Sequence, residues 1–305
     1  MGATIARMFP PKFLPERDMP DLSGKVTFVT GGNTGIGYET VKQLLLKNAK
    51  VYLAARSLEK ATAAINRLEN ETKKTAIFIQ LDLADLPSVR KAAETFLAQE
   101  SKLDLLFNIA GVMTPPSDML TAQNYDLQFG TNVMGHFFLT ELLIPAFTKS
   151  YEETKVPARI INTTSVGHQF APGDGMDFVS LKDGPERDAR LYGESKIGNI
   201  YISNYFAKKY SDVLVSCAVH PGGIESELQR YVCPFMALIS LFPLLYPAPM
   251  GAYTQLWGAT IATPAQITGQ YLVPWGKIGK ADKRASNTKV EDAVIAYLKE
   301  QVKDF

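Results

Sequence analysis

Residues 26–47 read VTFVTGGNTGIGYETVKQLLLK, a stretch made of a short apolar run, a glycine-rich turn and an amphipathic segment. The run at 26–30 is rich in β-branched residues and predicts a strand, and the segment at 38–48 has the periodicity of a helix. Glycines in the turn let the backbone approach a ligand, and a helix N-terminus offers free N–H groups and the positive end of its dipole. This order predicts a site for the phosphate bridge of a dinucleotide.

The spacing of the glycines leaves an alternative open. Gly31 is followed by Gly35 and Gly37, which differs from the G-x-G-x-x-G fingerprint of dinucleotide sites. A tight turn between strand and helix that binds no ligand has the same composition. The same strand–helix pattern recurs along the chain, and this repetition favours the dinucleotide site.

Apolar runs and amphipathic segments alternate from residue 25 onward. The further runs that predict strands are VYLAA (51–55), AIFIQL (76–81), LDLLFNI (103–109), RIINTT (159–164), VLVSCAV (213–219) and GQYLV (269–273). Helical patterns lie near 58–71, 87–100, 121–148, 190–210 and 250–262. Alternation of this kind, with strands that are apolar throughout, predicts a doubly wound seven-stranded parallel sheet (a Rossmann fold) with helices on both faces.

The domain organisation follows from the same pattern. We expect residues 1–21 to form an N-terminal arm and residues 22–305 to form a single catalytic domain, because no linker and no internal repeat interrupts the alternation. Residues 171–190 are rich in Gly, Pro and charge and predict a loop. Residues 232–249 are apolar and uncharged, but four prolines argue against one continuous membrane-spanning helix there.

Composition limits the functions that the chain can have. The 305 residues are 46% hydrophobic and 21% charged, as in a soluble protein with a sizeable core. A net charge of +1 offers no basis for broad nucleic-acid binding. Two cysteines exclude a disulfide scaffold and favour a reducing compartment. The first 21 residues carry charges and prolines where a signal peptide needs an apolar run, so we expect a cytoplasmic protein.

The ends of later strands indicate which dinucleotide is bound. Arg56 follows the second strand, where an NAD site places a carboxylate, and a planar guanidinium suits the 2′-phosphate of NADP(H). An exposed arginine at a helix start is the alternative. Asp82 and Leu83 follow the third strand and would flank the adenine. The fourth strand ends in FNIAG (107–111), whose small residues would leave room for a ribose.

Four motifs in this order resemble those of the short-chain dehydrogenase/reductase family, over nearly all of residues 22–273. TGGNTGIG (30–37) is similar to its glycine motif and NIAG (108–111) to its N-[NA]-A-G motif, with Ile109 as a bulkier second residue. YGESK (192–196) matches its Tyr-x-x-x-Lys, and the Pro-Gly at 221–222 matches the motif after its sixth strand. Within the family the chain looks most like the retinol-dehydrogenase-like branch, whose members mostly prefer NADP(H), and many related fungal reductases of uncertain substrate share this resemblance.

The resemblance implies a role for individual residues. It assigns catalysis to Asn132, which would hold a water in a proton relay, to Ser165, which would bond the substrate oxygen, to Tyr192 as general acid/base, and to Lys196, which would bind the nicotinamide ribose. The residues it implies for cofactor binding are Gly31, Asn33, Thr34, Gly35, Ile36, Arg56, Asp82, Leu83, Asn108, Ala110, Gly111, Tyr192, Lys196, Pro221, Gly222, Ile224 and Ser226. Ser226 stands where the family often has Thr, so a hydroxyl is kept.

The chemistry of the pair at 192 and 196 supports these roles. An ordinary tyrosine has a pKa near ~10, and a cation within ~4–6 Å favours the tyrosinate. We therefore expect Lys196 to lower the pKa of Tyr192 toward a value useful in general acid/base catalysis, and Ser165 to stabilise the developing oxyanion. Taken alone, the pair would also fit one face of an ordinary amphipathic helix.

The remaining candidates are weaker. His136, His168 and His220 lack metal-ligand spacing, so we expect no metal site. We place His136 in the core, and Cys217 inside a strand as an inert thiol. His168 would border the substrate cavity or serve a loop. Met113 and Met119 would line a pocket or merely pack.

We therefore expect an NADP(H)-dependent oxidoreductase that interconverts a hydrophobic aldehyde or ketone and its alcohol, with reduction favoured. A lid around residues 225–250 would cover the substrate, as in the family the chain resembles. The alternatives are a membrane-surface retinoid or sterol dehydrogenase, with 232–249 in peripheral contact with the membrane, and a non-catalytic NADP(H) sensor. Monomer and homodimer both remain open.

Overall fold

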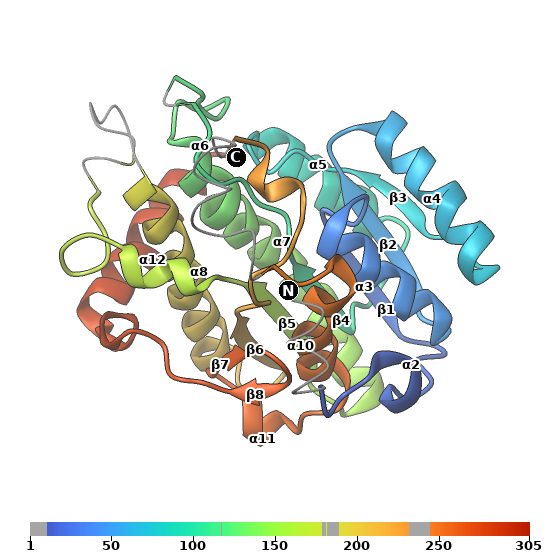
Figure 1. The fold of residues 1–305 in the computed structure, drawn as a ribbon. Coiled ribbons are helices and arrows are strands. Elements are labelled where there is room, and N and C mark those ends of the chain that lie inside the picture. The colour runs from blue at the N-terminus through green and yellow to red at the C-terminus, as the bar shows by residue number, and fades with distance from the viewer. Residues whose placement is uncertain (1–10, 117, 179–180, 182–188, 232–244) are drawn as a thin grey trace.

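The computed structural model describes residues 11–305, with the exception of 117, 179–180, 182–188 and 232–244. Its described part contains one eight-stranded sheet in the order β3-β2-β1-β4-β5-β6-β7-β8 (Figure 1). The strands are β1 (Val26–Thr30), β2 (Lys50–Ala55), β3 (Ile77–Gln80), β4 (Leu105–Asn108), β5 (Ala158–Thr163), β6 (Leu214–Val219), β7 (Tyr271–Val273) and β8 (Lys277–Ile278).

The first seven strands pair in parallel, as the sequence predicted. The structure adds β8, which runs antiparallel to β7 at the sheet edge. A strand of two exposed residues carries no apolar pattern, so sequence analysis had no signal for it. The doubly wound parallel fold is otherwise confirmed.

Helices cover both faces of the sheet (Figure 1). They are α3 (Gly35–Leu46), α4 (Leu58–Thr72), α5 (Leu86–Leu97), α6 (Leu127–Phe129), α7 (Gly135–Thr154), α8 (Ala189–Lys209), α10 (Ala248–Thr260), α11 (Pro264–Ile267) and α12 (Thr288–Val302). Shorter helical turns are η1 (Gly130–Met134), η2 (Val166–Phe170), η3 (Glu227–Tyr231) and η5 (Lys283–Ser286).

Alternate residues of each strand face two separate cores. Phe28 and Tyr52 pack with the residues of α5, α7, α8 and α12, and both rings meet Phe96 edge-to-face, with ring centroids 5.4 and 4.9 Å apart. Val29 and Leu53 lie on the opposite face with α3, α4 and α10. Because both faces are covered, the strands are apolar throughout, which is the pattern that made them recognisable.

Two further elements lie outside the alternation. The short helix α2 (Pro15–Asp18) holds residues 11–21 against α3, where Gln43 donates to Glu16 at 2.9 Å and Leu22 N–H donates to Lys47 O at 2.6 Å. The C-terminal helix α12 was not predicted. Its buried residues Val294 and Leu298 are one turn apart and belong to the core beneath α8.

None of the helices in the described ranges combines the length and the apolarity that crossing a bilayer requires. The apolar stretch at 232–249, predicted to be a substrate lid or a membrane contact, falls largely on residues 232–244, outside those described. The described residues on either side of 232–244 are hydrogen-bonded to each other. Glu225 N–H donates to Tyr246 O at 2.9 Å, and Tyr246 N–H donates to Gly223 O at 2.8 Å.

Candidate active site

The carboxyl ends of the parallel strands meet at one edge of the sheet, and a cavity of about 550 Å³ opens there. Strand order reverses between β1 and β4, so the connections leave on opposite faces and the crevice between them stays open. The glycine turn, the ends of β2 to β5 and residues 220–231 contribute to its walls. Segments far apart in the sequence therefore share one site.

The glycine turn brings the start of α3 against the cavity. A Cβ atom at Gly37 would lie 2.1 Å from Gly31 O, so only glycine allows this approach of the helix to the turn. Thr34 is the N-cap of α3, yet its side chain makes no capping hydrogen bond in the described structure. The first N–H groups of α3 thus face the cavity with the positive end of the helix dipole, and these donors fit the diphosphate of a dinucleotide.

Most of the residues predicted to bind the cofactor line this one cavity. They are Gly31, Asn33, Thr34, Gly35, Ile36, Arg56, Asp82, Leu83, Ala110, Gly111, Tyr192, Lys196, Pro221, Gly222, Ile224 and Ser226. Ser165, Met113 and Met119 line it as well. Asn108, predicted to contact the cofactor, and Asn132, predicted to be catalytic, do not.

Asn108 lies beneath the cavity floor and is 2% exposed. Its amide donates to Asn162 Oδ1 at 2.9 Å and to Thr140 Oγ1 at 3.2 Å. The side chain thus joins β4 to β5 and α7 rather than facing a ligand. Its effect on the site is to fix the end of β4, from which Ala110 and Gly111 extend into the cavity wall.

Asn132 is fully buried in η1, a π-helical turn at the start of α7. Such turns often occur at functional sites because they displace backbone groups from the regular hydrogen-bond ladder. The Asn132 amide bonds both the N–H and the carbonyl of Val112 at 2.9 Å, and it donates to Ser195 Oγ at 2.9 Å. Its side chain therefore anchors the loop after β4 to α8, next to Lys196.

His136 is buried, as predicted, and links the glycine turn to Asn132. Asn132 O can only accept, so the Nδ1 atom of His136, 3.0 Å away, carries the proton. The Nε2 atom then accepts from Thr30 Oγ1 at 2.9 Å. Burial lowers the pKa of His136 to about 4, so the ring is neutral. Thr30 also accepts from the N–H groups of Ile109 and Ala110 at 2.9 and 3.1 Å.

Ser165, Tyr192 and Lys196 come together on one wall of the cavity. Ser165 follows β5 and caps η2 by accepting from Gly167 N–H at 3.0 Å, and its side chain bonds the phenol of Tyr192. Lys196, one turn along α8, donates to Thr163 O at 3.2 Å, and its Nζ lies 5.6 Å from the centroid of the Tyr192 ring. The predicted one-face arrangement of the pair on α8 is present.

The expected lowering of the Tyr192 pKa is not found in the structure. Burial raises the pKa of the phenol to about 12, and the hydrogen bond to Ser165 only partly offsets this. Burial also lowers the pKa of Lys196 to about 8. At neutral pH the phenol is therefore protonated and the lysine charged. The prediction went wrong because it counted the charge of Lys196 and left out the cost of burying an anion.

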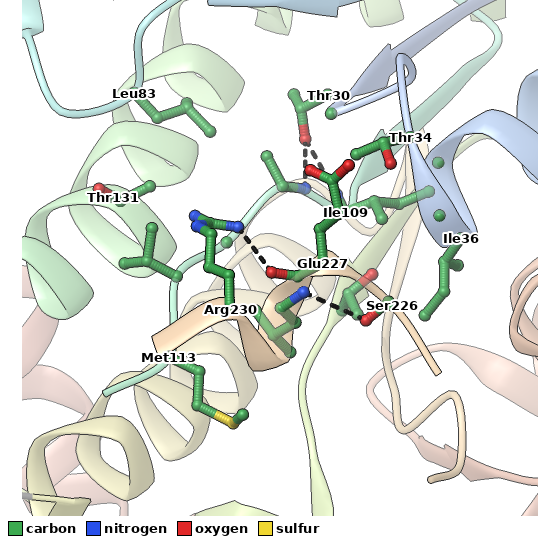
Figure 2. A pocket seen from close by; sticks show the side chains of 18 of the residues that line it. Thr30, Thr34, Ile36, Leu83, Ile109, Met113, Thr131, Ser226, Glu227 and Arg230 are labelled. Carbon is green, nitrogen blue, oxygen red and sulfur yellow. Dashed lines mark hydrogen bonds between the residues drawn. The ribbon is translucent and has the colours of Figure 1, made fainter. Parts of the chain in front are cut away.

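Sequence analysis did not predict that Glu227 and Arg230 would bring charged side chains to one wall of the cavity. Figure 2 shows Ser226, Glu227 and Arg230 at η3, with the Glu227 carboxylate extending toward Thr30 and Ile109 and the Arg230 guanidinium lying on the side of Thr131. Arg230 donates to the carbonyl of Glu227 at 3.0 Å. Two opposite charges three residues apart, just after Ser226, were the available signal, but they fell within the segment predicted to be an apolar lid.

The structure also gives the positions of Cys217 and of the two other histidines. Cys217 is buried in β6, and burial raises the pKa of its thiol to about 12, so it is the inert thiol that was expected. His220 lines the cavity, whereas His168 lies behind its wall. Within the described ranges, no group of three or more His, Cys, Asp or Glu side chains is arranged to hold a metal ion.

Known proteins are similar to this chain over most of its length. The family model for short chain dehydrogenase matches residues 25–235. A short-chain dehydrogenase/reductase of Armillaria gallica is 47% identical over 99% of this chain and 98% of its own. Retinol dehydrogenase 11 of Mus musculus is 38% identical over 82% of this chain and 78% of its own.

Solved structures agree with the fold. A putative uncharacterized protein from Mycobacterium paratuberculosis superimposes with a TM-score of 0.74 at 26% identity, covering 94% of this chain and 97% of that one. The complex of Pseudomonas aeruginosa RhlG with NADP gives 0.65 at 25% identity, covering 84% and 96%.

The sheet order and the glycine turn at the start of α3 define a Rossmann fold. The matching family model and the relatives establish that the chain belongs to the short-chain dehydrogenase family of oxidoreductases, and it is similar to retinol dehydrogenase within that family.

The buried charge of Lys196 should affect the free energy of unfolding. Its pKa falls from 10.5 in the unfolded chain to about 8 in the folded protein. Below pH 8 the lysine is charged in both states, and burying this charge lowers the free energy of unfolding. Lys196→Met should therefore raise the free energy of unfolding at pH 7 by about 1–3 kcal/mol while abolishing activity. The gain should disappear as the pH rises past 10.5.

Urea unfolding of Lys196→Met and wild type at pH 7 and at high pH measures this effect. The control is Lys91→Met on the exposed surface of α5, for which we expect a change within about 0.5 kcal/mol. Destabilisation of Lys196→Met at pH 7 would show that the ammonium group contributes more through its bonds than its burial costs.

Proposed function

We propose that the protein is an NADP(H)-dependent oxidoreductase that interconverts a hydrophobic aldehyde or ketone and its alcohol, with reduction favoured. The observation that carries this proposal is the wall formed by Ser165, Tyr192 and Lys196, in the same cavity as the uncapped N-terminus of α3. A proton donor, an oxygen-binding hydroxyl and a phosphate-binding turn in one cavity are the parts that carbonyl reduction requires.

The residues divide the chemistry among them. The nicotinamide, when bound, supplies the hydride that reaches the carbonyl carbon. Tyr192 donates its proton to the carbonyl oxygen, and its raised pKa keeps that proton available at neutral pH. Ser165 orients the same oxygen by hydrogen bonding. The charge of Lys196, 5.6 Å from the Tyr192 ring, stabilises the tyrosinate that remains.

The choice of NADP(H) rests on the end of β2. Arg56 lines the cavity and is exposed, and it has no carboxylate partner among the described residues. Ser57 caps α4 by accepting from Lys60 N–H at 3.3 Å, and both of these residues line the cavity beside Arg56. A helix start with two cations suits a 2′-phosphate. The structural relative RhlG, crystallised with NADP, supports this choice.

The apolar part of the cavity lining supports a hydrophobic substrate. Apolar side chains from several segments line the cavity, namely Met113, Met119, Leu127, Val166, Tyr231 and Leu245. Flexible methionines and aromatic residues of this kind favour an aromatic or lipid-like carbonyl compound. Similarity to retinol dehydrogenase 11 is consistent with such a substrate.

A panel of aldehydes, ketones and alcohols, followed by NADPH absorbance, tests the reaction and its substrate class. We expect kcat/KM for straight-chain aldehydes to rise about three- to fourfold per added CH₂ until the cavity is filled, because each buried CH₂ contributes about 0.8 kcal/mol. Matched hydrophilic aldehydes of the same length are the control. Equal efficiency with the hydrophilic series, or turnover of no carbonyl compound, would contradict the proposal.

Replacing Arg56 tests cofactor selection. Arg56→Ala should lower kcat/KM for NADPH by about 10- to 100-fold, the value of a charge-assisted hydrogen bond, and leave kcat/KM for NADH nearly unchanged. Arg67→Ala, which removes an arginine of α4 that does not line the cavity, is the matched control. Comparable efficiency with both cofactors, unaffected by Arg56→Ala, would refute the role of this residue.

A further inference from the structure

The peptide bond between Ser165 and Val166 is held from both sides by histidines. The carbonyl of Ser165 accepts from His168 Nδ1 at 2.6 Å, and the N–H of Val166 donates to His220 Nδ1 at 3.3 Å. These two polar groups belong to one planar unit, so the pair of contacts resists its rotation. The hydroxyl that faces Tyr192 is carried by the residue at the start of this unit.

The two rings must be neutral and must carry their protons on different nitrogens. A carbonyl only accepts, so His168 carries its proton on Nδ1, and its Nε2 accepts from Asp282 N–H at 2.9 Å. A backbone N–H only donates, so Nδ1 of His220 is bare, and it also receives Gly222 N–H at 3.4 Å. Burial lowers the pKa of both rings, that of His220 to about 4, in agreement with neutral forms.

The outer support of His168 comes from the C-terminal part of the chain. Asp282 precedes η5, and its carboxylate pairs with Arg284 at 2.8 Å. Arg284 in turn donates to the carbonyl of Gln169 at 2.8 Å and to that of Ala171. The segment 282–284 is therefore hydrogen-bonded to the residues that follow Ser165, which lie more than one hundred positions earlier in the sequence. His168 is completely buried between the two segments and meets the ring of Tyr271 with centroids 5.1 Å apart.

We propose that His168 and His220 are positioning residues that fix the Ser165–Val166 peptide, and through it the Ser165 hydroxyl against Tyr192, with the Asp282 N–H as the outer anchor. This inference rests on the proposed function for the part that Ser165 plays in turnover. The hydrogen-bond arrangement itself does not depend on that function and is tested separately.

Nitrogen NMR of the protein labelled with ¹⁵N-histidine tests the arrangement without any activity. The chain has three histidines, so three ring signal pairs are expected. At pH 7 the spectrum should show His136 and His168 with the proton on Nδ1, and His220 with the proton on Nε2. His220→Asn assigns the third pair by its loss. A charged ring for His168 or His220, or the same tautomer for both, would overturn the proposal.

Kinetics test the effect on catalysis through a substitution that removes one N–H. Asp282 has φ −54°, a value that proline adopts, and it lies outside a helix. Asp282→Pro removes both the side chain and the N–H that His168 accepts, whereas the matched Asp282→Ala removes only the side chain. We expect kcat of Asp282→Pro to fall about tenfold below that of Asp282→Ala, with KM for NADPH equal within about twofold.

The same pair of variants in a His168→Phe background distinguishes positioning from a general backbone effect. Phenylalanine keeps the contact with Tyr271 but has no nitrogen, so the difference between proline and alanine at 282 should vanish. A difference that persists in that background, or that is missing in the wild-type background, would refute the role of the anchor.

The contact made by His220 is tested by comparing a conservative substitution with an apolar one. His220→Asn offers an oxygen near the position of Nδ1 and should keep kcat within about threefold, while His220→Leu should lose at least tenfold. Equal kcat in the two would overturn the positioning role. A wild-type protein that reduces no carbonyl compound refutes the proposed function and the catalytic part of this inference, and leaves the NMR outcome to decide the hydrogen-bond arrangement.

Discussion

The ammonium group of Lys196 lies almost completely inside the protein, with 3% of the residue exposed, and the rest of the site is arranged around this buried charge. Its position is set by the end of β5, where Thr163 O accepts from it, and a Cβ atom at Gly111 would lie 3.7 Å from it. A charge in such a place costs stability unless it is paired. In the proposed reaction, this cation stabilises the tyrosinate that remains after proton transfer.

The polar groups around Lys196 are held mainly by neutral hydrogen bonds. Asn132 bonds the backbone of Val112, and His136 joins Asn132 to Thr30. Neutral rings and amides fix geometry without adding charges that would compete with Lys196 for the phenol. The parallel sheet makes this possible, since it brings the ends of β1, β4 and β5 to one edge.

Sequence reasoning predicted the features with a strong local pattern. The seven parallel strands were visible because helices cover both faces of the sheet and keep most strand residues apolar, and the residues of the cavity were visible because short motifs fix backbone positions. The helix α12 was not predicted, although Val294, Leu298 and Val302 have the apolar periodicity of a helix. The π-helical turn, the inward side chain of Asn108 and the raised pKa of Tyr192 depend on three-dimensional burial, which no local pattern encodes.

In the proposed reaction Tyr192 delivers the proton, and the cavity binds the cofactor independently of Tyr192. Single-turnover mixing of the NADPH-loaded protein with a hydrophobic aldehyde, for wild type and Tyr192→Phe, measures both. We predict that Tyr192→Phe leaves the NADPH affinity unchanged and lowers the rate of NADPH oxidation by about 10²–10⁴-fold, the usual contribution of a general acid. An unchanged rate in Tyr192→Phe would contradict it.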